Sequence, residues 1–132
     1  MSEPPSGSTR AKGQRVESLV ALHLERCEHE VLARNVSIGG AELDLIAHDR
    51  SAPEDIIVFV EVRSRDTDER GSPLETVDHH KQRKLVRGAT AWLVAKDLWE
   101  RVAVRFDVVG VTDPTGDHPR IEWIKDAFQV DG

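Results

Sequence analysis

The stretch IIVFVEVRSR, residues 56–65, decides how this chain folds. It opens with a run of β-branched and aromatic residues, which is typical of a central strand buried on both faces of a sheet. A carboxylate in such a strand loses its solvation and must recover it from a partner. Glu61 therefore predicts a cationic partner inside the fold. The alternative is an edge strand with Glu61 and Arg63 on a solvated face.

Length and composition restrict the class of protein. Residues 1–13 are rich in Ser, Pro and Gly, which predicts a disordered leader. The length of 132 residues predicts one folded domain, which we place over residues 14–130. The single cysteine excludes an internal disulfide and a cysteine-rich zinc site, and it suits a reducing compartment. Nothing resembles a signal peptide or a membrane span, so we expect a cytoplasmic protein without a membrane partner. The net charge of −6 means that any nucleic-acid contact must use a local basic patch.

The pattern of apolar residues predicts seven elements in the order αβββαββ. Two glycines, Gly39 and Gly40, indicate a hairpin between the first two strands, and a short loop returns the third strand beside them. This order is typical of an α/β (α+β) domain with a mixed central sheet of about five strands flanked by helices. The predicted helices lie within residues 14–28 and 79–96, and the predicted strands lie within residues 31–36, 41–48, 56–65, 101–111 and 120–124.

The second strand carries two acids. Alternate residues of a strand share a face, so Glu42 and Asp44 are predicted to point one way while Leu43 and Leu45 point the other. If this strand neighbours the third one, Asp44 and Glu61 lie side by side and repel each other unless a cation lies between them. Oxygen ligands without cysteine or clustered histidine favour Mg²⁺ or Mn²⁺ over zinc.

A third acid, Glu17, falls on the packed face of the first helix and is predicted to approach the same site. Plainer interpretations exist for each residue. Glu17 is also a first-turn acid that the helix dipole favours, and Asp44 is also a candidate for an exposed residue or an ion-pair partner of Arg63. Three elements that each place an acid among apolar residues favour the shared metal site.

Seven collinear blocks carry a resemblance to a known family. Together they resemble the YraN family of small bacterial proteins, which are similar to archaeal Holliday-junction resolvases and to the PD-(D/E)XK nucleases. The blocks are GQRVE (13–17), VLARNV (31–36), GGAELDLIA (39–47), IIVFVEVRSR (56–65), GSPLETVDHHKQRKL (71–85), RFDVV (105–109) and IEWIKDAF (121–128).

The resemblance implies a restriction-endonuclease-like fold and a metal-dependent DNA endonuclease. Such an enzyme hydrolyses phosphodiester bonds, and branched or structured DNA is the substrate that the resolvase likeness suggests. Resolvase-like folds commonly act as two-fold dimers, so a homodimer is one assembly that the resemblance allows. A non-catalytic nucleic-acid-binding or protein-interaction module with a degenerate nuclease site is the alternative function.

Carried over residue by residue, the resemblance implies that Glu17, Asp44 and Glu61 are metal ligands. It also implies that these three residues and Arg63 are the catalytic residues. Arg63 stands where the motif has lysine. Because arginine stays protonated in proteins, Arg63 can orient the attacking water or balance charge but cannot act as a base. Glu42, two residues before Asp44, is a candidate for tuning the site from behind the ligands, or a ligand itself.

The run HHKQRKLVR, residues 79–87, is basic in a chain that is acidic elsewhere. Such a run is where phosphates would be held, although a solvated helix face explains some of its charges equally well. Asp107 is a further charge in a predicted strand, and it either pairs with a basic residue or helps to build the site. The residues assigned to DNA binding are Lys81, Arg83, Lys84 and Arg65.

Overall fold

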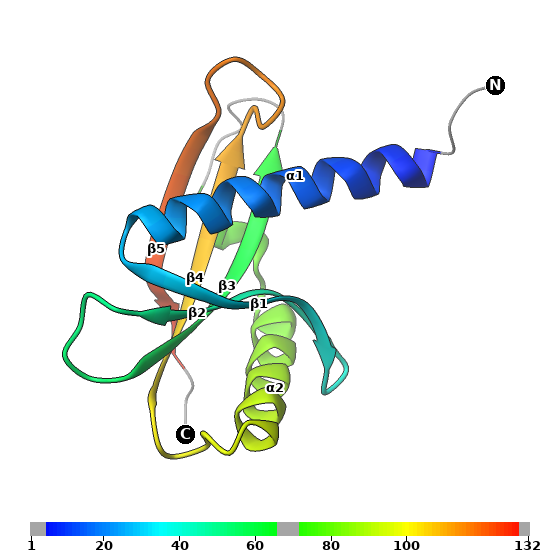
Figure 1. The fold of residues 1–132 in the computed structure, drawn as a ribbon. Coiled ribbons are helices and arrows are strands. Elements are labelled where there is room, and N and C mark those ends of the chain that lie inside the picture. Colours follow the sequence, from blue (N-terminus) through cyan, green and yellow to red (C-terminus); the bar gives the residue numbers. More distant parts are fainter. Residues whose placement is uncertain (1–4, 66–71, 130–132) are drawn as a thin grey trace.

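The structure, a computed structural model, describes residues 5–65 and 72–129. Its centre is a five-stranded sheet with the spatial order β1-β2-β3-β4-β5, and Figure 1 shows how the two helices are placed around it. Only β3 and β4 run parallel; the other neighbouring pairs are antiparallel. The elements are α1 (Pro5–Arg26), β1 (His29–Ile38), β2 (Ala41–Asp49), β3 (Ile56–Arg65), the short 3₁₀ helix η1 (Pro73–Thr76), α2 (His79–Ala95), β4 (Ala103–Thr112) and β5 (Arg120–Phe128).

The predicted α/β fold and the order αβββαββ are confirmed. The strand β3 pairs with β2 on one side and with β4 on the other, so the edge-strand interpretation of residues 56–65 is wrong. Because β3 and β4 are parallel, the chain must cross from one end of the sheet to the other between them, and η1 and α2 make that crossover.

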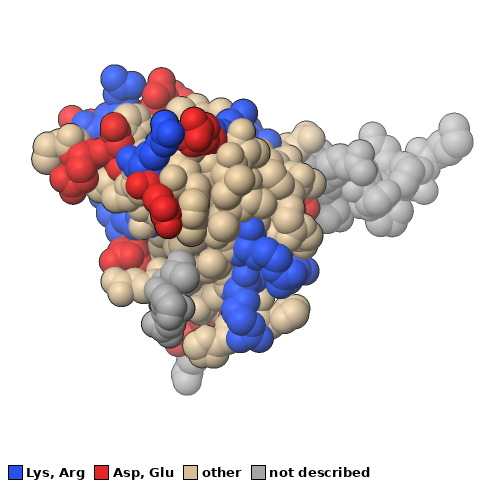
Figure 2. All heavy atoms as spheres, turned by 90° about the horizontal axis from the view of Figure 1, so that it is seen from below, with Lys and Arg blue, Asp and Glu red and all other residues tan. Residues whose placement is uncertain are grey.

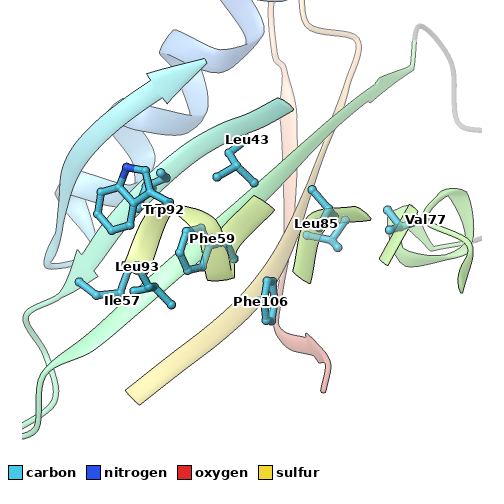
Figure 3. Close-up of a cluster of buried hydrophobic side chains, with 11 residues drawn as sticks. Leu43, Ile57, Phe59, Val77, Leu85, Trp92, Leu93 and Phe106 are labelled. Atoms are coloured by element: carbon cyan, nitrogen blue, oxygen red, sulfur yellow. The ribbon is translucent and has the colours of Figure 1, made fainter. Parts of the chain in front are cut away.

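Each helix covers a different face of the sheet, and each face has its own apolar core. The α2 core, part of which Figure 3 shows, packs side chains of α2 against β2, β3 and β4. The α1 core contains Val16, Val20, Leu24, Leu45, Val58, Val60, Val109 and Val111. The α2 core contains Leu43, Ile46, Ile57, Phe59, Val77, Leu85, Ala89, Trp92, Leu93, Phe106 and Val108. The central strand is therefore buried from both sides, as its composition requires.

The predicted hairpin turn is confirmed at Gly39 and Gly40, which have φ angles of 62° and 76°. Both angles lie in the left-handed region, where glycine has no steric penalty. A Cβ on Gly39 would also lie 3.2 Å from the carbonyl oxygen of Arg87, because the turn lies against α2. A Cβ on Gly88 would meet Ala41 Cβ at 2.9 Å, so α2 and the hairpin approach closely.

The first helix begins earlier than the sequence predicted. Residues 5–13 were assigned to a disordered leader, whereas the structure places them in α1; residues 1–4 lie outside the described residues. Proline at the first position of a helix costs no hydrogen bond, which explains why the helix can begin at Pro5. Among residues 13–26 of α1, whose side chains are described, Val16 is the first that packs in the α1 core, and Figure 1 shows the preceding turns projecting past the sheet. Within residues 5–65 and 72–129, no helix is both long and apolar enough for a bilayer crossing.

Candidate metal centre

The strands β2 and β3 separate at Asp44. Their ladder runs from Asp49 paired with Ile56 as far as Leu45 paired with Val60. Beyond that point the Asp44 carboxylate replaces the main-chain partner, because the backbone N–H of Val62 donates a hydrogen bond to Asp44 Oδ2 at 2.9 Å. This hydrogen bond holds the side chain of Asp44 against β3 at Val62, the residue that follows Glu61.

The alternation of side chains shifts at the same place. Leu43 packs in the α2 core and Leu45 in the α1 core, so the prediction that these two residues share a face is wrong. The residue of β1 between the partners of Leu45 and Leu43 is Asn35, whose φ of 52° lies in the left-handed region. Glu42 is exposed, whereas Asp44 is partly buried and bonds to β3.

Glu61 has the cationic partners that its burial requires. Its carboxylate is 5% exposed, and its Oε2 lies 2.9 Å from an Arg63 guanidinium nitrogen and 3.5 Å from Lys81 Nζ. Its other oxygen, Oε1, is buried and accepts no hydrogen bond from the part of the chain that the structure describes. A buried carboxylate oxygen without a partner is rare in folded proteins and indicates a site that is completed by something else.

Asp44 and Glu61 form a close pair of carboxyl groups. Burial, and then the charge of Glu61 and direct contact with it, raise the pKa of Asp44 to about 7. The hydrogen bond from Val62 and the charge of Lys81 act in the opposite direction without cancelling this effect. Two carboxylates that share a poorly solvated site cannot both ionise freely, so the pair retains a proton near neutral pH.

Glu17 lies at the border of this pair. Burial, followed by the charges of Asp44 and Glu42, raises the pKa of Glu17, while a hydrogen bond with Asn35 and the charge of Arg34 lower it. Its Oε1 is buried and has no hydrogen-bond partner. The helix α1 therefore brings a third acid within electrostatic reach of Asp44, from the side of the sheet that α1 covers.

The three predicted ligands are only partly assembled. Nowhere in residues 5–65 and 72–129 are three His, Cys, Asp or Glu side chains grouped so that they could hold a metal ion. Asp44 and Glu61 are together, but Glu17 contacts Asn35 and Glu61 is held by two cations. The unpartnered oxygens of Glu17 and Glu61 nevertheless fit a hard divalent cation, which takes carboxylate oxygens as ligands.

Two open grooves are each lined by one of the cations that contact Glu61. One, of about 640 Å³, runs along the Gly39–Gly40 turn and is lined by Glu42, Lys81 and Lys84. The other, of about 320 Å³, lies between the end of β3 and η1 and is lined by residues that include Arg63 and Arg65. Each groove thus carries two of the basic side chains that the sequence singled out.

The remaining predicted DNA-binding residue, Arg83, is exposed on α2. Figure 2 shows that Lys and Arg side chains gather on one part of the face that is seen from below, while most acidic side chains in that view lie elsewhere. Lys81 was predicted only to bind DNA as part of a basic run. In the structure its ammonium also contacts Glu61 of the acidic pair.

The model of a known protein family matches most of this chain. Residues 16–111 match the model of a family described as "Uncharacterised protein family UPF0102". The chain belongs to this family. The matched part of this UPF0102 chain contains the whole acidic pair, Glu17, and the cations Arg63 and Lys81.

Similar UPF0102 proteins occur in several bacteria. One from Nitratidesulfovibrio vulgaris is 43% identical over 120 residues, which cover 91% of this chain and 85% of the relative. One from Geobacter sulfurreducens is 40% identical over 118 residues (89% and 88%). One from Marinobacter nauticus is 40% identical over 123 residues (93% and 96%). The likeness therefore extends over nearly the whole length of these proteins.

Sequence reasoning missed a second buried polar cluster of this UPF0102 chain, on the α1 side of the sheet. Arg105 binds Asp107 through two nitrogens, at 2.9 and 3.0 Å, and Asp49 through a third, at 2.7 Å. Asp107, which is fully buried, also accepts hydrogen bonds from Trp123 Nε1 at 2.8 Å and from the N–H of Asp126 at 2.9 Å. Asp107 thus pairs with a basic residue, and the alternative that it helps to build the acidic site is not supported.

This cluster also includes the buried residue His29. Its Nδ1 lies 2.8 Å from the carbonyl oxygen of Cys27, and its Nε2 lies 2.9 Å from an Arg105 nitrogen. Because guanidinium can only donate, Nε2 accepts in the contact with Arg105, and Nδ1 donates to the carbonyl oxygen of Cys27. Although burial raises the pKa of Asp49, hydrogen bonds from Ser51 and Arg105 hold it well below its usual range. The only signal in the sequence was the spacing of Arg105 and Asp107 on one strand face.

Proposed function

We propose that this protein is a metal-dependent DNA endonuclease that hydrolyses phosphodiester bonds in the cytoplasm. The observation that carries the proposal is the pair of Asp44 and Glu61, two carboxyl groups in one poorly solvated site with an unpartnered buried oxygen. Such a pair destabilises the fold and so favours a site that is used, because perturbed carboxyl groups concentrate at functional sites. Arg63 and Lys81 beside the pair supply positive charge where a phosphate would bind.

Asp44 and Glu61 would hold Mg²⁺ or Mn²⁺, with Glu17 as the third ligand and Glu42 behind it. The bound ion would lower the pKa of a water molecule and offset charge on the phosphate. The Arg63 side chain is partly exposed, so its guanidinium could donate to a phosphate oxygen while it stays beside Glu61. Since the guanidinium stays protonated, Arg63 orients and balances charge but removes no proton from the water.

The substrate path follows the two grooves. A DNA strand that crosses the acidic pair would contact Lys81 and Lys84 in the groove along the hairpin turn, and Arg63 and Arg65 in the groove beside η1. Lys and Arg side chains on both sides of a reaction centre hold the phosphates that flank the scissile one. The resolvase resemblance favours branched DNA and a homodimer that cuts two strands symmetrically.

A non-catalytic nucleic-acid-binding or protein-interaction module is the second candidate function. The observation that favours it is that Arg63 and Lys81 already neutralise Glu61, and that the described residues contain no ready group of three metal ligands. In that case the acids would be retained as an internal ion-pair network, and the grooves would bind a partner without cleaving it.

Cleavage of labelled DNA separates the two candidates. The purified chain is incubated with duplex, flap and four-way-junction substrates in Mn²⁺, in Mg²⁺ and in EDTA. We expect cleavage in the metal-containing reactions only, and a loss of at least a hundredfold in Asp44→Asn and Glu61→Gln. This loss follows because a site with one charged ligand removed binds and polarises the ion poorly.

Two controls make the result specific. Glu25→Gln removes an exposed acid from α1, and we expect it to cleave like the wild type. Cleavage that persists in both Asp44→Asn and Glu61→Gln would come from a contaminant. DNA binding without any cleavage, with either metal and on every substrate, would refute the nuclease and support the non-catalytic module.

A further inference from the structure

We propose that Lys81 is an internal counterion of the acidic pair, which occupies Glu61 until a divalent cation binds and then leaves to contact the substrate phosphate. This inference rests on the proposed function, and it gives Lys81 a positioning role at the site itself. The sequence suggested only that Lys81 belongs to a basic helix surface.

The geometry around Glu61 is that of a site filled by its own side chains. Arg63 and Lys81 both approach Oε2, at 2.9 and 3.5 Å, while Oε1 accepts nothing. Two cations at one oxygen repel each other, and a divalent ion added beside them would be repelled by both. A divalent ion at the unpartnered Oε1 of Glu61 would therefore bind more tightly once one of the two cations has moved away.

Lys81 is the cation that can move. Its contact with Glu61 is the longer one, and a lysine side chain swings on a flexible stem with little preference in direction. The Lys81 side chain is 34% exposed and lines the open groove along the hairpin turn, so it has a place to go. Arg63 has its Nε buried within the protein, and its planar group is held at the shorter distance.

The helix places Lys81 at the site against the preference of the helix dipole. Asp78 caps α2 by accepting a hydrogen bond from the N–H of Lys81 at 2.8 Å, which puts Lys81 in the first turn. A cation at this end of a helix is unfavourable, and α2 has no acid of its own in that turn. The Glu61 carboxylate, 3.5 Å from the Lys81 ammonium, offsets this charge, and the N-cap fixes the position from which Lys81 reaches it.

Competition between Lys81 and the metal has a measurable consequence. Lys81→Met keeps most of the length of the side chain and removes the charge, so Glu61 loses its mobile counterion. We expect the variant to bind Mn²⁺ more tightly than the wild type, by a factor on the order of ten, because one repelling unit charge close to the ion is gone. Lys96→Met is the matched control, since Lys96 lies at the opposite end of α2.

The test is isothermal titration of MnCl₂ into the full chain, for the wild type, Lys81→Met and Lys96→Met. The expected result is tighter Mn²⁺ binding in Lys81→Met alone, together with a larger rise of its melting temperature when Mn²⁺ is added. The proposal would be overturned if Lys81→Met bound Mn²⁺ no more tightly than the wild type. It would also be overturned if neither the wild type nor Lys81→Met bound Mn²⁺. Circular dichroism spectra confirm that each variant is folded.

The outcome for Lys81 is separable from the outcome for the nuclease. Tighter Mn²⁺ binding by Lys81→Met in a protein that cleaves no DNA would support the counterion and refute only the enzyme. A wild type that cleaves DNA while Lys81→Met binds Mn²⁺ with unchanged affinity would refute only the counterion.

Discussion

The acidic pair should make the stability of this protein depend on pH in an unusual direction. The pKa of Asp44 is raised from 3.8 to about 7 in the folded state, so folding takes up a proton between these two values. The free energy of unfolding therefore falls as pH rises from about 4 to about 7, and the full loss is present above pH 7. At about 1.4 kcal/mol per pH unit this loss amounts to roughly 4 kcal/mol for Asp44.

The substitution that removes this loss is Asp44→Asn. Asparagine resembles the protonated carboxyl group and its amide oxygen can still accept the hydrogen bond from Val62. We expect the variant and the wild type to be similarly stable near pH 4, and the variant to be more stable at pH 8. Allowing for movement of the ionised carboxylate toward water, the gain at pH 8 should be about 2–4 kcal/mol.

Urea denaturation followed by circular dichroism at pH 4, 5, 6, 7 and 8, in EDTA, measures this difference. The control is Glu25→Gln, which removes an exposed acid from α1 and for which we expect less than about 0.5 kcal/mol at each pH. A difference between Asp44→Asn and the wild type that stays constant from pH 4 to 8 would refute the raised pKa, and with it the description of the acidic pair.

Three further predictions concern the rest of the fold. Asp107→Asn should lower the free energy of unfolding by about 3–5 kcal/mol in urea denaturation, because it leaves Arg105 buried with too little negative charge. Gly110→Ala should lower the melting temperature, at a cost of about 1–3 kcal/mol, since its Cβ would overlap the Pro73 ring and displace η1; unchanged melting would contradict that packing. Asp49 has a pKa below its ordinary value, so it stabilises the fold above about pH 4 and this contribution disappears as pH falls further. Asp49→Asn should therefore be less stable than the wild type at pH 7, with a difference that shrinks in acid titrations monitored by fluorescence.

The order of elements could be predicted because each one has a local signal. The hairpin is marked by Gly39 and Gly40, and the start of α2 follows the capping residue Asp78. The central position of β3 follows from its apolar composition, and once β2 is its neighbour, the proximity of Asp44 and Glu61 follows as well. These inferences use only spacing along the chain and the burial preferences of side chains.

The details of the site could not be predicted, because they depend on contacts between distant segments. Leu43 and Leu45 of β2 pack in different cores, and the pattern of residues along the chain gives no sign of this shift. The approach of Lys81 to Glu61 depends on where α2 crosses the sheet, and a helical residue offers no sign of which strand it will meet. Glu17 was expected to converge on the pair and instead contacts Asn35 at its border.

The sequence by itself determined the family, through its similarity to other members. It also determined the mixed five-stranded sheet and the presence of acids where a strand is buried, because these follow from local propensity and periodicity. Only the tertiary structure decided which charges meet: Arg63 and Lys81 at Glu61 in one cluster, and Arg105 with Asp107 in the other. The physical reason is that a buried charge is stabilised by the nearest partner in space. That partner is chosen by the packing of whole helices and strands rather than by neighbours in the chain.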